Sequence, residues 1–97
     1  LAAHAVAAAD PDSTMAVFPT DHSIADANRF ERAVRGAVAE AAKDALVCLG
    51  IRPDRPATGF GYLRCAQPPA GRAAVRVARF VEKPDAATAR RYVRSGR

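Results

Sequence analysis

Apolar residues along the chain include two short, uninterrupted runs. Residues 15–18 read Met-Ala-Val-Phe and residues 46–51 read Leu-Val-Cys-Leu-Gly-Ile, and neither run contains a charged side chain. A continuous apolar run of about four to eight residues is typical of a strand that is buried on both faces. The pattern therefore predicts buried strands at 15–18 and 46–51.

The segment between these runs repeats its apolar residues at helical spacing. They form one stripe, made by Phe30, Val34, Ala37, Val38, Ala41 and Ala45. Asp26 precedes the stripe as a candidate N-cap, and Glu31 and Arg35 form an i,i+4 pair on the other side. A helix between two buried strands predicts a βαβ unit with a right-handed crossover.

The second half of the chain predicts two more strands. We expect one at 60–65 and one at 74–81, where apolar and polar residues alternate, with a Pro/Gly turn at 67–72 between them. The alternation predicts that three side chains point to apolar surroundings: Val75, Val77 and Phe80.

The remaining elements are helical. An alanine-rich helix is expected at 1–9, followed by a turn at 10–13, because the residue before a proline avoids the helical region. Asp85 is a candidate N-cap for a last helix at 86–95, and Gly96 is a typical helix stop.

The expected order is helix, strand, helix, strand, strand, strand, helix, which indicates an α/β fold. Ligands of such sheets bind beyond the carboxyl ends of the parallel strands. Residues 19–22 and the Pro-rich loop 52–59 would both lie there.

Composition limits the class of protein. Ninety-seven residues allow one domain, and the apolar fraction of 49% argues against wholesale disorder. The net charge is +5, but the 13 arginines among the 15 cationic residues are spread from Arg29 to Arg97. Nucleic-acid binding is therefore not favoured, because such modules use clustered charge and stacking aromatics.

The two cysteines and the hydropathy pattern indicate the cellular compartment of the protein. Cys48 and Cys65 form no CxxC pair, and Cys48 is expected to be a buried free thiol because it lies in an apolar run. Stretches of about 18 apolar residues, as needed to span a membrane, are absent. These features favour a cytoplasmic protein with no membrane partner.

Asp21 is the first candidate for chemistry, because it follows the apolar run at 15–18. A carboxylate there suits Mg²⁺, which usually takes one or two carboxylates together with substrate phosphates. The alternative is a carboxylate that only forms a turn or caps a helix.

A second candidate group is Glu82 with Lys83, before Pro84, together with Gly61 in Gly59-Phe60-Gly61. Neighbouring side chains in a strand point to opposite faces, so Glu82 could accept sugar hydroxyls while Lys83 meets a phosphate. A bare glycine backbone suits packing against a sugar ring. The alternatives are two solvated charges and a β-bulge or tight turn at the glycines.

Three segments together resemble the mannose-1-phosphate guanylyltransferase family of nucleotidyltransferases. Residues 17–24, Val-Phe-Pro-Thr-Asp-His-Ser-Ile, are similar to that family's strand ending in Pro-Ala-Asp-His. Residues 46–63 resemble its stretch Gly-Ile-x-Pro…Pro-Glu-Thr-Gly-Tyr-Gly-Tyr-Ile, and residues 80–85, Phe-Val-Glu-Lys-Pro-Asp, resemble its Phe-x-Glu-Lys-Pro motif. The resemblance covers nearly the whole chain.

The resemblance implies a partial Rossmann-like nucleotidyltransferase (GT-A-like) sheet with flanking helices. It implies that Asp21 holds a catalytic Mg²⁺, that Gly61 presents its backbone to the sugar, and that Glu82 binds sugar hydroxyls. Lys83 would lie near the sugar phosphate and, with Asp21, would be catalytic. The implied reaction joins GTP and mannose 1-phosphate into GDP-mannose and pyrophosphate, and the full-length protein could be a homo-oligomer.

Departures from the family pattern shape the expectation for this chain. Ala57 stands where the family has Glu, and Phe60 where it has Tyr. The family's Gly-rich activation loop and its second metal-binding Asp/Asn have no counterpart in residues 1–97. We therefore expect residues 1–97 to be the central part of a catalytic domain, truncated at both ends and inactive alone. The alternative is a non-catalytic relative that binds a sugar phosphate or a partner.

Overall fold

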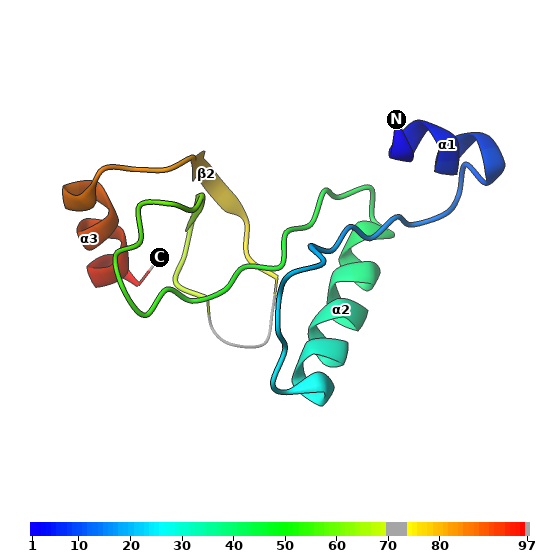
Figure 1. Ribbon diagram of the computed structural model, residues 1–97. Coiled ribbons are helices and arrows are strands. Elements are labelled where there is room, and N and C mark those ends of the chain that lie inside the picture. Colours follow the sequence, from blue (N-terminus) through cyan, green and yellow to red (C-terminus); the bar gives the residue numbers. More distant parts are fainter. Residues whose placement is uncertain (70–73, 97) are drawn as a thin grey trace. The chain divides into compact units, whose positions relative to one another are not determined.

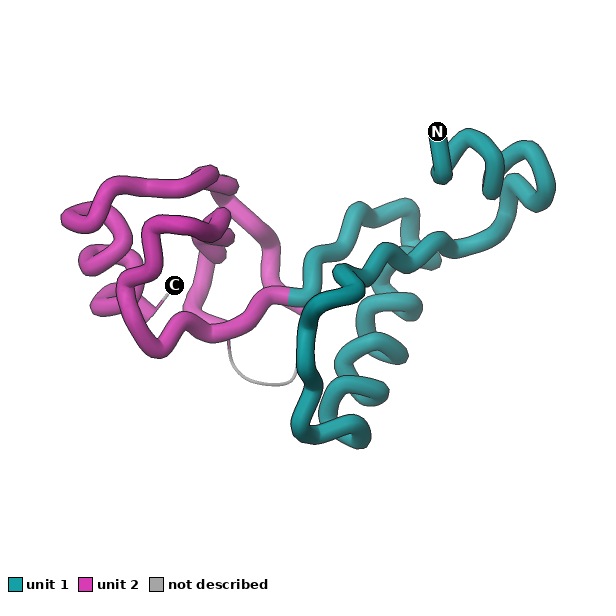
Figure 2. Tube along the Cα trace, in the orientation of Figure 1, with its two compact units in different colours: residues 1–49 teal, residues 50–97 magenta. Residues whose placement is uncertain are grey.

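The computed structural model describes residues 1–69 and 74–96, and its elements are shown in Figure 1. The chain divides into two compact units, Leu1–Leu49 and Gly50–Arg97, coloured separately in Figure 2. In the described part of the chain, no helix is long and apolar enough to cross a membrane.

The first unit contains two helices, α1 (Ala2–Ala9) and α2 (Ala27–Ala41). The predicted cap of α2 is confirmed, because the Asp26 carboxylate accepts a hydrogen bond of 2.8 Å from the Arg29 amide. The predicted pair on its solvent side is also present, with Arg35 Nη2 2.7 Å from Glu31 Oε1. Local signals therefore define both the start of α2 and one of its faces.

The apolar stripe of α2 is only partly covered. Phe30 meets Phe18 edge to face, with ring centroids 5.6 Å apart, and Val34, Ala37 and Ala41 are half-buried. Val38 is exposed, and Ala45 lies beyond the end of the helix. The predicted stripe is thus half-buried along the length of α2, with Phe18 covering it at Phe30.

The two buried strands predicted at 15–18 and 46–51 are wrong, because neither segment is a strand. Val17 is 77% exposed and Leu46 is 99% exposed. The thiol of Cys48, predicted to be buried, is exposed, and both cysteines are free. A doubly buried strand needs a hydrogen-bonded neighbour on each edge, and within residues 1–69 and 74–96 neither run has one. The predicted βαβ crossover is therefore absent from the described residues.

The second unit contains a β-hairpin and a helix. Strand β1 (Tyr62–Cys65) pairs antiparallel with β2 (Val77–Val81), and Tyr62 lies opposite Val81. The strands predicted at 60–65 and 74–81 are thus confirmed with shorter bounds. Residues 70–72 of the predicted turn lie outside the described residues.

Helix α3 (Ala86–Ser95) matches its prediction at both ends. The Asp85 carboxylate accepts a hydrogen bond of 2.7 Å from the Thr88 amide, and Gly96 ends the helix with a left-handed φ of 63°. These hydrogen bonds, first from the Thr88 backbone and then from its side chain, lower the pKa of Asp85 below its ordinary value of 3.8.

The core of the second unit is formed by residues of β1 and α3. Ala89 is fully buried and Tyr62 is 9% exposed, with its ring 5.6 Å from that of Tyr92. The prediction of apolar surroundings is wrong for Val77 and for Phe80, which is 58% exposed. The structure therefore combines helices with a two-stranded antiparallel sheet, and the expected Rossmann-like sheet is not seen in the described residues.

Candidate active site

The hairpin brings two motifs that are far apart in the chain to one place. Gly61 immediately precedes β1 and Glu82 immediately follows β2, so the pairing of Tyr62 with Val81 places them side by side. A Cβ atom on Gly61 would lie 3.0 Å from Glu82 Oε2. The Lys83 amide donates a hydrogen bond of 3.2 Å to the Phe60 carbonyl, which closes this end of the hairpin.

Phe80 accounts for the glycine at position 61. A Cβ atom on Gly61 would lie 2.6 Å from both Cε2 and Cζ of the Phe80 ring, closer than any real side chain can approach. The ring thus occupies the space in front of the Gly61 backbone, which was expected to be bare. Phe80 was not among the predicted site residues, although its ring and the Glu82 carboxylate both lie where a Gly61 side chain would be.

Glu82 and Lys83 lie beyond the end of β2, so the strand rule that predicts opposite faces does not apply to them. Lys83 has a φ of 43°, in the left-handed region that is unusual for a residue with a side chain. Both side chains are exposed, and within residues 1–69 and 74–96 neither takes part in an ion pair. A carboxylate and an ammonium are therefore accessible next to Gly61.

A hydrogen bond from a tyrosine holds the loop before β1 in place. The Tyr62 hydroxyl donates a hydrogen bond of 2.8 Å to the carbonyl of Ala57. Ala57 is half-buried, and its backbone rather than its side chain makes this contact. The loop next to the candidate site is thus anchored to the core of the second unit.

Asp21 lies in an exposed turn of the first unit, whereas Gly61, Glu82 and Lys83 belong to the second. The structure therefore assembles three of the four predicted site residues. Among the described residues, no three His, Cys, Asp or Glu side chains gather as a metal cluster. Asp21 still fits Mg²⁺, because its carboxylate is a hard oxygen ligand and this ion usually takes much of its shell from water and phosphate.

Sequence comparison places the chain in a class of proteins. All of residues 1–97 match the family model described as nucleotidyl transferase, so the chain belongs to that family. This confirms the resemblance that the three motifs indicate. No solved structure matches the chain.

Among its relatives is the mannose-1-phosphate guanylyltransferase of Escherichia coli (strain K12), which is 47% identical over 90 residues, or 90% of this chain and 19% of that protein. Xanthan biosynthesis protein XanB of Xanthomonas campestris pv. campestris (strain B100) is 47% identical over 85 residues, covering 88% of this chain and 18% of that protein. Alginate biosynthesis protein AlgA of Pseudomonas aeruginosa is 41% identical over 99 residues, covering 99% of this chain and 20% of that protein. The chain thus spans about a fifth of the length of these curated relatives.

Proposed function

We propose that this chain is part of an enzyme that transfers a guanylyl group from GTP to mannose 1-phosphate, giving GDP-mannose and pyrophosphate. The observation that carries the proposal is the hairpin, which joins Gly61, Glu82 and Lys83 at one accessible end. The name of the relative from Escherichia coli supports the choice of substrates.

Each residue has a physical role in this proposal. The Glu82 carboxylate accepts hydrogen bonds from sugar hydroxyls, and the Lys83 ammonium meets the sugar phosphate as a point charge. Bound Mg²⁺ would supply charge neutralisation at the phosphates, with Asp21 as its protein ligand. The contribution of these groups is to position the sugar phosphate and to balance its charge, and no covalent enzyme intermediate is required.

Binding of mannose 1-phosphate to the 97-residue chain tests the sugar side of the proposal. We expect Glu82→Gln to weaken binding about tenfold, as for the loss of a charged hydrogen-bond partner. Glu40→Gln is the matched control, because Glu40 is a carboxylate of α2 whose partner is Lys43. Equal affinities of the Glu82→Gln variant and the unchanged chain, measured by calorimetry, would remove Glu82 from the site.

Turnover is a separate measurement. We propose that the 97 residues alone release no pyrophosphate from GTP and mannose 1-phosphate, since parts of the family pattern have no counterpart in them. Measurable GTP-dependent release by the purified chain would show that its site is sufficient for catalysis.

A second candidate function is a non-catalytic relative that binds a sugar phosphate or a partner, and Ala57 is the observation that favours it. Because the Ala57 carbonyl holds the Tyr62 hydroxyl, a new side chain at position 57 leaves that hydrogen bond in place. If the missing carboxylate limits binding, Ala57→Glu raises the affinity for mannose 1-phosphate, and Ala57→Gln raises it less. Unchanged affinity in both variants would show that the missing carboxylate does not limit binding. The observation that favours a non-catalytic relative would then be lost.

A further inference from the structure

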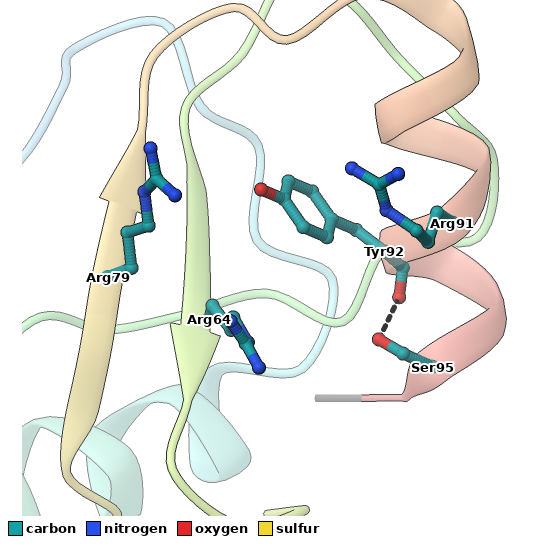
Figure 3. A pocket seen from close by; sticks show the side chains of 5 residues that line it. All are labelled: Arg64, Arg79, Arg91, Tyr92 and Ser95. Atoms are coloured by element: carbon teal, nitrogen blue, oxygen red, sulfur yellow. Dashed lines mark hydrogen bonds between the residues drawn. The ribbon is translucent and has the colours of Figure 1, made fainter.

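A cationic hollow lies in the second unit, between the hairpin and α3 (Figure 3). Its volume is about 580 Å³, and its lining consists of Arg64, Arg79, Arg91, Tyr92 and Ser95. A hollow of this size is in the range of small-molecule sites, which run from about 300 to 1,000 Å³.

The hollow and the candidate active site lie on opposite faces of the hairpin. Arg79 and Phe80 are neighbours in β2, and successive side chains of a strand point to opposite faces. Phe80 covers Gly61, whereas Arg79 lines the hollow with residues of α3. A ligand in the hollow would therefore occupy a different site from one that meets Gly61 and Glu82.

Two of the arginines lie directly opposite each other in the sheet. Arg64 is the register partner of Arg79, which places their Cβ atoms about 4.5–5.5 Å apart. Like charges in this arrangement destabilise a strand pair unless an anion lies between or beside them. The hairpin thus carries an electrostatic cost that a bound anion would remove.

No carboxylate of the described residues neutralises this charge at close range. The ion pairs there join other side chains, and Arg64, Arg79 and Arg91 take part in none of them. Arg91 donates a hydrogen bond of 3.4 Å to the Thr88 hydroxyl, and its charge is the smallest of the causes that lower the pKa of Asp85. Ser95 donates a hydrogen bond of 2.9 Å to the Tyr92 carbonyl, as drawn in Figure 3.

We propose that this hollow is a binding site for a small molecule that carries two or more phosphate groups. The inference goes beyond the proposed transferase function, and it rests on the Arg64–Arg79 pair together with the hollow that Arg91 and Tyr92 complete. Guanidinium groups match phosphate oxygens with paired hydrogen bonds, and three cations exceed what one monoanion can balance.

Titration of the 97-residue chain with inorganic pyrophosphate tests the proposal, with GDP as the arm that distinguishes a nucleotide from free diphosphate. We expect saturable binding and a rise in melting temperature. Arg64→Gln and Arg79→Gln should each weaken pyrophosphate binding about tenfold. Arg90→Gln removes one charge from α3 outside the hollow and should leave the affinity unchanged. If GDP binds more tightly than pyrophosphate, the site is assigned to a nucleotide. If pyrophosphate binds more tightly, the site is assigned to free diphosphate.

The melting temperature without anion separates binding from a structural role. Arg64→Gln relieves the repulsion with Arg79, so we expect it to melt at the same temperature as the unchanged chain or higher, while its shift with pyrophosphate is lost. A variant that melts lower without anion would show that Arg64 supports the fold directly and would count against the proposal.

Four other results would overturn the proposal. These are the absence of binding, an equal effect of sulfate at matched ionic strength, an equal loss in Arg90→Gln, and tighter binding of a short DNA duplex than of pyrophosphate. Lys83→Gln tests the location, because Lys83 follows β2 next to the candidate active site. If that variant loses pyrophosphate binding, the anion sits at the candidate active site rather than in the hollow.

Discussion

At the scale of single residues, Gly61 is explained by its neighbours rather than by its own backbone angles. It does not adopt the left-handed φ that glycine permits, which among the described glycines is found at Gly96. Its requirement is space, because the Phe80 ring and the Glu82 carboxylate lie where a side chain would be. The residue that looks like a bare sugar-facing backbone is also what lets Phe80 and Glu82 approach.

Gly61→Ala should therefore displace Phe80 and Glu82 while changing stability only modestly. Phe80 is 58% exposed, so its ring can turn outward at a cost of about 0.5–1.5 kcal/mol. Adding Phe80→Ala to Gly61→Ala removes the clash, so the two changes are not additive in chemical denaturation. Additive free energies of unfolding would mean that the two residues do not compete for the same space.

At the scale of elements, the sequence was most informative where structure is decided locally. The caps Asp26 and Asp85 and the stop at Gly96 were predictable, because each acts within one helical turn. The runs at 15–18 and 46–51 were mispredicted, because a buried strand depends on partners that the run itself does not specify. The approach of Gly61 to Glu82 depends on the hairpin register, and the position of the Phe80 ring depends on tertiary packing, neither of which the local sequence specifies.

Helix α2 allows the effect of helix propensity to be measured at a position where an added side chain makes no packing contact. Gly36 lies in its interior, and a Cβ atom there would meet nothing within 4 Å. Gly36→Ala should therefore raise the free energy of unfolding of the first unit by about 0.5–1 kcal/mol. Ala39→Gly, an exposed position of the same helix, should lower it by a similar amount, and both changes can be followed by circular dichroism during denaturation.

Helix α3 should lose stability in acid because of its cap. The hydrogen bonds that Asp85 accepts hold its pKa below 3.8, so the ionised cap contributes its full stabilisation of the helix above that pH. The contribution is lost as pH falls through the lower pKa of the folded state. Asp85→Asn keeps a capping side chain but should flatten this part of the acid profile in thermal melts. An acid profile identical to that of the unchanged chain would assign the loss to another group.

At the scale of the whole molecule, the described residues leave many large apolar side chains uncovered. Leu46 is 99% exposed, Ile51 85% and Val17 77%, whereas Ala89 is fully buried. Exposed apolar surface of this extent favours association.

Leu46→Ser should accordingly reduce self-association of the 97-residue chain in sedimentation experiments and change stability by less than about 0.5 kcal/mol. Ala89→Leu should instead cost about 1–3 kcal/mol, because it overfills the space around a fully buried alanine. A large stability loss in Leu46→Ser would show that Leu46 is covered in solution.

The hydrogen bond from the Lys83 amide to the Phe60 carbonyl has a consequence for observing this protein. It forms only when the two segments that flank the hairpin are together, so its proton exchanges with solvent when they separate. The exchange rate of that single amide therefore measures how often the candidate active site comes apart, without any substrate, cofactor or turnover.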